Sequence, residues 1–223
     1  MTTRVTVGER RVPVHALEDV PGNEISKRAL EVALTGGHPF VLLAIAESYA
    51  NWLVRVGAEM ARKAGLFFDC LVYPVCPCGH YGDFRGQCRC SVEVLTEHYA
   101  ELARLAGDFD MYVECPAVPV RDVLAKPTSR ERGDVVLERV LKAREHTVGP
   151  EVGDGAKAIL KMAVEDVRNL SPEKALRVAR TIAALSFADK VEPEHICEAI
   201  QYRALNHVWV YQREERATVP ETA

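Results

Sequence analysis

Short apolar runs alternate with a helical pattern in the first half of the chain, and this order constrains the fold more than any other feature. Residues 39–45 (PFVLLAI) form a continuous apolar run of strand length, residues 47–64 carry apolar side chains at helical spacing, and residues 66–73 (LFFDCLVY) are again strand-like. A strand, a helix and a strand with short connections form a parallel pair with a right-handed crossover. We therefore predict an α/β core.

Three further segments extend this core. They are predicted as a helix at 23–34, a helix at 92–105 and a strand at 111–115. A parallel sheet needs cover on both faces, so helices are expected on each side of it. The predicted fold class is thus α/β, with a small, about three-stranded parallel sheet flanked by helices.

The second half of the chain has a different pattern, because its periodic segments are all helical. Helices are predicted at 135–145, 156–168, 172–185 and 193–207. Pro172 and Pro193 stand where a helix tolerates proline, in the first turn. The expected organisation is an N-terminal extension (1–18), an α/β core (19–116), a proline-containing linker (117–133), a helical domain (134–212) and a flexible tail (213–223).

Composition excludes several classes of protein. The 223 residues are 48% hydrophobic and 27% charged, as in folded globular proteins, and no apolar run approaches the roughly 18 residues of a membrane span. The first residues, MTTRVTVGERR, are charged where a signal peptide is apolar, so we expect a cytoplasmic protein. The net charge of −4 gives no general attraction to nucleic acid or to an anionic membrane.

A glycine-rich loop, CPCGHYGDFRGQCRC, holds two Cys-x-Cys pairs separated by nine residues. Zinc prefers four soft donors in a tetrahedron, and four thiolates leave no open position for water, so the predicted site is structural. Free thiols, or ligands that have lost their metal, remain the alternative, and His80 could replace one thiol. The predicted metal ligands are Cys76, Cys78, Cys88 and Cys90.

Three other cysteines lie in apolar patterns: Cys70, Cys115 and Cys197. We predict them to be buried and inert. The alternative, an enzyme with Cys70 or Cys115 as its nucleophile, lacks a histidine that is obviously placed to activate the thiol.

The sequence also resembles a known family in three segments. These are residues 19–38 (DVPGNEISKRALEVALTGGH), the cysteine loop with the serine that follows it, and residues 175–205 (ALRVARTIAALSFADKVEPEHICEAIQYRAL). They resemble the magnesium-chelatase subunit I-like branch of the AAA+ ATPases, in particular proteins related to the competence protein ComM. The resemblance implies a reduced AAA+-like P-loop fold with an all-helical, lid-like domain after it.

The phosphate-binding loop of that family is replaced in this chain. Relatives carry G-x-x-x-x-G-K-[ST] after the first strand, where glycine N–H groups, a lysine and a hydroxyl hold the phosphates and magnesium. The corresponding stretch here is AIAESYAN, which includes a carboxylate that repels phosphate. We therefore expect neither ATP hydrolysis nor ATP binding from this degenerate loop, whose substituted positions are Ala44, Glu47, Tyr49, Ala50 and Asn51.

Other ATPase parts implied by the resemblance are missing as well. The long insertion with the acidic magnesium-binding strand is absent, and Pro74 stands where relatives have a polar sensor asparagine. The arginine-finger stretch reads Asp-Phe-Asp at 108–110, and the second sensor segment is shortened at 170–172. The strands of an AAA+ module lie in the order five, one, four, three, two, and this deletion would remove strands two and three. The remaining strands, five, one and four, would correspond to residues 111–115, 39–45 and 66–73, side by side in that order.

The expected function is a non-catalytic binding or regulatory module with a structural zinc site. The resemblance implies an active AAA+ paralogue, or a second copy of this chain, as its partner. The alternatives are a residual ATP-binding protein and a nucleic-acid-binding accessory protein of ComM-like DNA processing. For the latter, a basic and aromatic surface would comprise His80, Tyr81, Phe84, Arg85 and Arg89.

Overall fold

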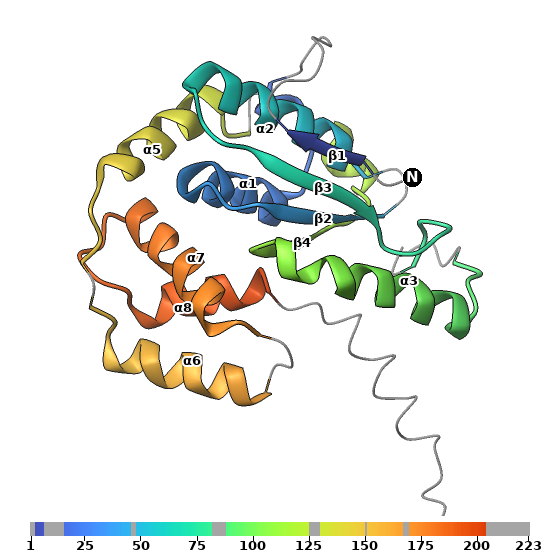
Figure 1. The fold of residues 1–223 in the computed structure, drawn as a ribbon. Helices are drawn as coiled ribbons and strands as arrows, with labels where there is room; N and C mark the ends of the chain where they lie inside the picture. Colours follow the sequence, from blue (N-terminus) through green and yellow to red (C-terminus); the bar gives the residue numbers. More distant parts are fainter. Residues whose placement is uncertain are drawn as a thin grey trace, which may run out of the picture.

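A four-stranded sheet lies at the centre of the first half of the computed structural model (Figure 1). The structure describes residues 3–6, 16–45, 48–81, 88–124, 130–149, 151–166 and 170–203. Strand β2 (Phe40–Ala44) pairs in parallel with β3 (Asp69–Pro74) on one side and with β4 (Met111–Cys115) on the other. The predicted three-stranded parallel sheet is confirmed.

The fourth strand, β1 (Thr3–Thr6), was not predicted. It pairs with β3 in the antiparallel sense, with Thr3 opposite Val72 and Thr6 opposite Asp69, and gives the order β1-β3-β2-β4. Its residues belong to the segment that we expected to be an N-terminal extension. The strand covers the edge of β3, where unpaired backbone groups would otherwise invite pairing with another chain.

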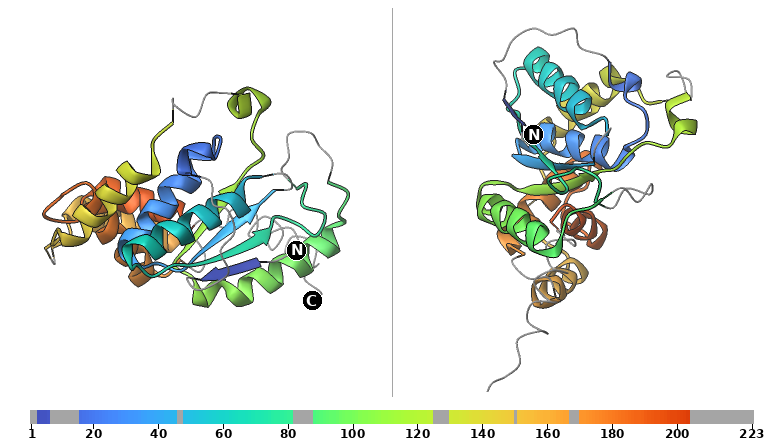
Figure 2. Two further views of the ribbon diagram at one scale, coloured as in Figure 1. Left: turned by 90° about the horizontal axis from the view of Figure 1, so that it is seen from above. Right: turned by 90° about the vertical axis from the view of Figure 1, so that its right-hand side faces the viewer.

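Helices cover both faces of the sheet (Figure 2). Alternate residues of a strand point to opposite faces, and the two hydrophobic clusters divide accordingly. Leu42 and Val72 pack on the side of α1 (Glu24–Gly36) and α2 (Ala50–Ala64). On the other side, Val41 and Leu71 pack with residues of α3 (Val92–Leu105).

The predicted helical second half is also confirmed. Between residues 133 and 203, the described residues form α5 (Gly133–Glu145), α6 (Asp154–Asp166), α7 (Pro172–Leu185) and α8 (Pro193–Gln201). Both prolines occupy first-turn positions, and the Ser171 hydroxyl accepts a bond from the Lys174 backbone N–H at 3.3 Å. Helix α8 ends at Gln201 rather than at the expected residue 207. One short helix, α4 (Val120–Leu124), lies in the segment predicted to be a linker.

One hydrophobic cluster continues from the sheet into the helical half. It joins Leu42 of β2 and Leu30 of α1 to Val140 of α5, Ile182 of α7 and Ile196 of α8. Burial of apolar surface therefore holds these helices against the sheet. Among the described residues, no helix has the length and apolar character that crossing a bilayer requires.

Candidate metal centre and the former phosphate loop

The cysteine loop leaves the carboxyl end of β3 and leads into α3. Cys76 is buried directly after the strand, and the chain then turns through Gly79, whose φ of +80° suits glycine because it has no Cβ. The second pair, Cys88 and Cys90, returns just before α3. Residues 82–87, with the predicted surface residues Phe84 and Arg85, lie outside the described part of the chain.

The structure brings the four predicted ligands together. All four sulfur atoms lie within 4.8 Å of one another. The Sγ of Cys76 is 3.3 Å from that of Cys78 and 3.9 Å from that of Cys88, and the Sγ atoms of Cys78 and Cys88 are 3.7 Å apart. Four thiolates about 2.3 Å from a tetrahedral zinc would lie about 3.8 Å from one another. The cluster can therefore hold a metal such as zinc.

Polar backbone groups and charge also fit a cation at this place. The Tyr81 backbone N–H donates to the Cys76 sulfur at 3.2 Å. Burial works against ionisation of Cys78, but hydrogen bonds from the His80 backbone and from the thiols of Cys76 and Cys90 lower its pKa to about 6. Burial raises the pKa of Cys88 to about 12. Neighbouring thiolates repel one another, so four of them need a cation in their midst.

Of the other three cysteines, which we predicted to be buried, two are buried and one is exposed. Cys70 and Cys115 are buried in the sheet, and burial raises the pKa of both thiols, that of Cys115 to about 11. The prediction for Cys197 is wrong, because it is exposed. In α8 the buried positions are Ile196 and Ala199, and Cys197 points away from them to solvent.

The stretch that we predicted to be a degenerate phosphate loop, residues 44–51, joins β2 to α2. Ala44 ends β2, Tyr49 is the N-cap of α2, and Ala50 is buried in the first turn of that helix. The Tyr49 ring contacts the ring of Trp52 edge to face, with centroids 5.4 Å apart, and Asn51 is exposed. Glu47 lies outside the described residues.

Two backbone N–H groups of this connection are already bonded inside the protein. Ile45 donates to the carbonyl of Cys115 at 3.2 Å, and Ser48 donates to the carbonyl of Ile45 at 3.0 Å. A phosphate-binding loop needs such groups to point at its ligand. In the described part of this connection, residues 44–45 and 48–51, these two groups therefore point at partners within the protein rather than at a ligand.

Comparison with known proteins supports the resemblance. Residues 141–203, which include α6, α7 and α8, match the family described as "Magnesium chelatase, subunit ChlI C-terminal". The helical region from residue 141 onward is therefore similar to this C-terminal domain. The chain is also a distant homologue of the "Uncharacterized protein YifB" of Salmonella typhimurium strain LT2, with 29% identity over 159 residues. That match covers 60% of this chain and spans 30% of the length of YifB.

The helical region meets the α/β core at a buried polar cluster that the sequence analysis missed. His38, between α1 and β2, lies 2.9 Å from Asp110 through Nδ1 and 2.8 Å from the Thr181 hydroxyl of α7 through Nε2. The side chain of Asp110, at the start of β4, is only 4% exposed and also accepts a bond from Arg177 of α7. Asp110 belongs to the stretch that the resemblance matched to the family's arginine finger, and in this structure its side chain joins two parts of one chain.

Gly36 gives this cluster its room. A Cβ atom at Gly36 would lie 2.1 Å from Nε2 of His38 and 2.4 Å from the Thr181 oxygen, closer than non-bonded atoms can approach. The next residue, Gly37, ends α1 with a φ of +67°. Glycine is therefore needed at the two positions for different reasons. At Gly36 neighbouring atoms approach too closely for a Cβ, and at Gly37 the backbone has a positive φ.

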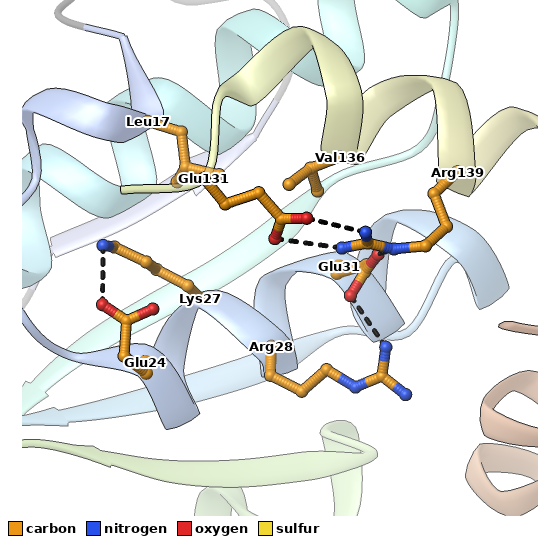
Figure 3. Close-up of a pocket in the computed structure, with 8 residues that line it drawn as sticks. All are labelled: Leu17, Glu24, Lys27, Arg28, Glu31, Glu131, Val136 and Arg139. Carbon is orange, nitrogen blue, oxygen red and sulfur yellow. Dashed lines mark hydrogen bonds and ion pairs between the residues drawn. The ribbon is translucent and has the colours of Figure 1, made fainter. Parts of the chain in front are cut away.

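A cavity of about 370 Å³ lies between α1, α5 and the turn at Leu17 (Figure 3). Its charged groups are paired with each other: the buried Glu31 contacts Arg28 and Arg139, Arg139 also contacts Glu131, and Lys27 contacts Glu24 (Figure 3). Arg28 further bonds Glu198 of α8 at 2.9 Å. The Glu31–Arg139 and Arg28–Glu198 pairs link the core to the helical region, and we assign all of these ion pairs a structural role.

Proposed function

We propose that the chain is a non-catalytic relative of the magnesium-chelatase-type AAA+ proteins that acts as a binding or regulatory module. The observation that carries this proposal is the phosphate-loop position. Ala50 stands where the lysine would be, and its small side chain is buried in the first turn of α2. A nucleotide would find no cation there to contact its β- and γ-phosphates.

The cysteine cluster gives this module a structural zinc site in our proposal. Four thiolates fill the coordination sphere, so the metal would activate no water. Cys76 adjoins β3, and Cys90 lies two residues before α3. A metal held between them would fix the distance between the strand and the helix that covers it. A small sheet gains stability from such a cross-link.

The proposed partner is an active AAA+ paralogue, which this chain would join without turning over nucleotide. The support is analogy with proteins that share the ChlI C-terminal domain, together with the buried contacts that hold that domain against the core. Capture of the tagged chain should then retain an ATPase of the same family. A chain that is recovered only as a monomer, with no such ATPase, would contradict this part of the proposal.

Nucleotide titration tests the central claim. We expect no magnesium-dependent heat of binding when ATP is titrated into the purified, zinc-loaded protein, and no phosphate release, because the lysine and glycine positions hold Ala50 and Tyr49. An active relative with an intact loop is the matched control for the assay. Micromolar, magnesium-dependent binding of ATP would overturn the proposal.

A further inference from the structure

Three cations of the helical domain converge on the loop that precedes β4. Lys174 of α7 donates from Nζ to the carbonyl of Phe109 at 2.9 Å and also to the carbonyl of Gly107. Arg203, after α8, donates from Nη1 to the carbonyls of Phe109 at 2.9 Å and Asp110 at 3.1 Å. Arg177 contacts the Asp110 carboxylate. Lys174 and Arg203 thus bond neutral carbonyl groups, and Lys174 also lies 4.0 Å from the Asp110 carboxylate.

The local charge is unbalanced in favour of the cations. Burial and the neighbouring Arg203 lower the pKa of Lys174, and two carboxylates, Asp110 and Asp108, raise it in part. Burial also lowers the pKa of Arg203, which lies 5.4 Å over the ring of Tyr112. Lys174, Arg177 and Arg203 therefore face two carboxylates, and two of these cations sit where their charge is disfavoured.

Unused donors remain at the same place. Nε of Arg203 is buried and has no hydrogen-bond partner among the described residues. A buried N–H group without a partner is rare in folded proteins and commonly indicates a bound water or ion. The side chain of Arg177 is 58% exposed, so its guanidinium can be reached from solvent. The amino end of α7 lies beside Lys174 and adds a positive potential.

We propose that Lys174, Arg177 and Arg203 form a binding site for a phosphate group. A phosphate dianion offers several acceptor oxygens, and guanidinium groups bind such oxygens with charge-assisted hydrogen bonds. The ligand would supply the missing negative charge and a partner for Nε of Arg203. This site is separate from the degenerate loop at residues 44–51, because the Asp110 loop precedes β4 whereas the degenerate loop follows the carboxyl end of β2.

Titration with inorganic phosphate, followed by amide chemical shifts at constant ionic strength, tests the site. We expect saturable shifts at residues 107–110 and 171–177 in the intact protein. Arg177→Gln should weaken the affinity about ten-fold, since a charge-assisted bond is lost. Lys63→Gln, which removes a 63% exposed lysine of α2, should leave the affinity unchanged. A parallel titration with AMP distinguishes free phosphate from the phosphate group of a nucleotide. The ligand that binds more tightly indicates which of the two the site takes.

A second variant keeps the test decisive. Arg203→Gln should abolish the phosphate-induced shifts, and if this variant does not fold, Arg177→Gln and Lys174→Gln carry the comparison. Equal responses to phosphate and to chloride in the unchanged protein would overturn the proposal. Equal phosphate affinity in the intact protein, Arg177→Gln and Lys174→Gln would overturn it as well. ATP binding at residues 44–51 would overturn the proposed function but not the phosphate site. The phosphate affinities of the Arg177→Gln and Lys174→Gln variants would still decide whether the phosphate site exists.

Discussion

Removal of the metal from the cysteine cluster is expected to lower the free energy of unfolding by about 4 kcal/mol when free zinc stands about 1,000-fold above its dissociation constant. For a chain of this length, such a loss corresponds to a fall in Tm of roughly 10 °C. The physical reason is that the cation balances thiolates that otherwise repel one another within 4.8 Å. Thermal unfolding with and without a strong chelator measures the difference.

Cys76→Ser should give the same fall in Tm and reduce the zinc content measured by mass spectrometry. The matched control is Cys197→Ser, because Cys197 is exposed and lies on α8, away from the cluster. We expect about one zinc per chain in the unchanged protein and in the control. The structural-zinc proposal would be wrong if Cys76→Ser kept its full zinc content, or if the chelator left Tm unchanged.

Gly36→Ala is expected to destabilise the protein by roughly 3 kcal/mol, through overpacking and the loss of hydrogen bonds in a buried cluster. The new Cβ would lie 2.1 Å from Nε2 of His38, so either the histidine or α7 must move. Movement of His38 breaks its contacts with Asp110 and Thr181 together. Chemical denaturation of the variant measures the loss in free energy.

Gly107→Ala is the control for that substitution. A Cβ at Gly107 would meet no atom within 4 Å, and the free energy of unfolding should change by less than about 0.5 kcal/mol. A Gly36→Ala variant that unfolds at the same denaturant concentration as the unchanged chain would contradict the assigned geometry of the polar cluster.

Continuous apolar runs explain why the parallel sheet could be predicted. Strands β2 and β3 are buried almost along their length, with helices on both faces of the sheet, so the runs that contain them, residues 39–45 and 66–73, are mostly apolar and stand out from their surroundings. Strand β1 lacks that signal, because it has four residues and pairs on one side only. Its partner, β3, lies far along the chain, so local sequence cannot show the pairing.

The two sites also differ in how far they could be predicted from the sequence. The spacing of Cys76, Cys78, Cys88 and Cys90 is local, and it was enough to group the four thiols. The polar cluster at the domain contact was missed, because His38 is 72 residues from Asp110 and 143 residues from Thr181. The glycine pair before His38 is the one local signal of this close approach.

The pairing of β1 also bears on how the chain folds. Thr3 pairs with Val72, and Phe40 of the central strand pairs with Met111, so the sheet forms only when distant segments meet. Closing such long loops costs chain entropy before any contact offsets it. Helices α7 and α8, by contrast, follow each other in the sequence and pack against each other. We therefore infer that the sheet forms more slowly than the helical region, and that β1 pairs only after β3 has formed.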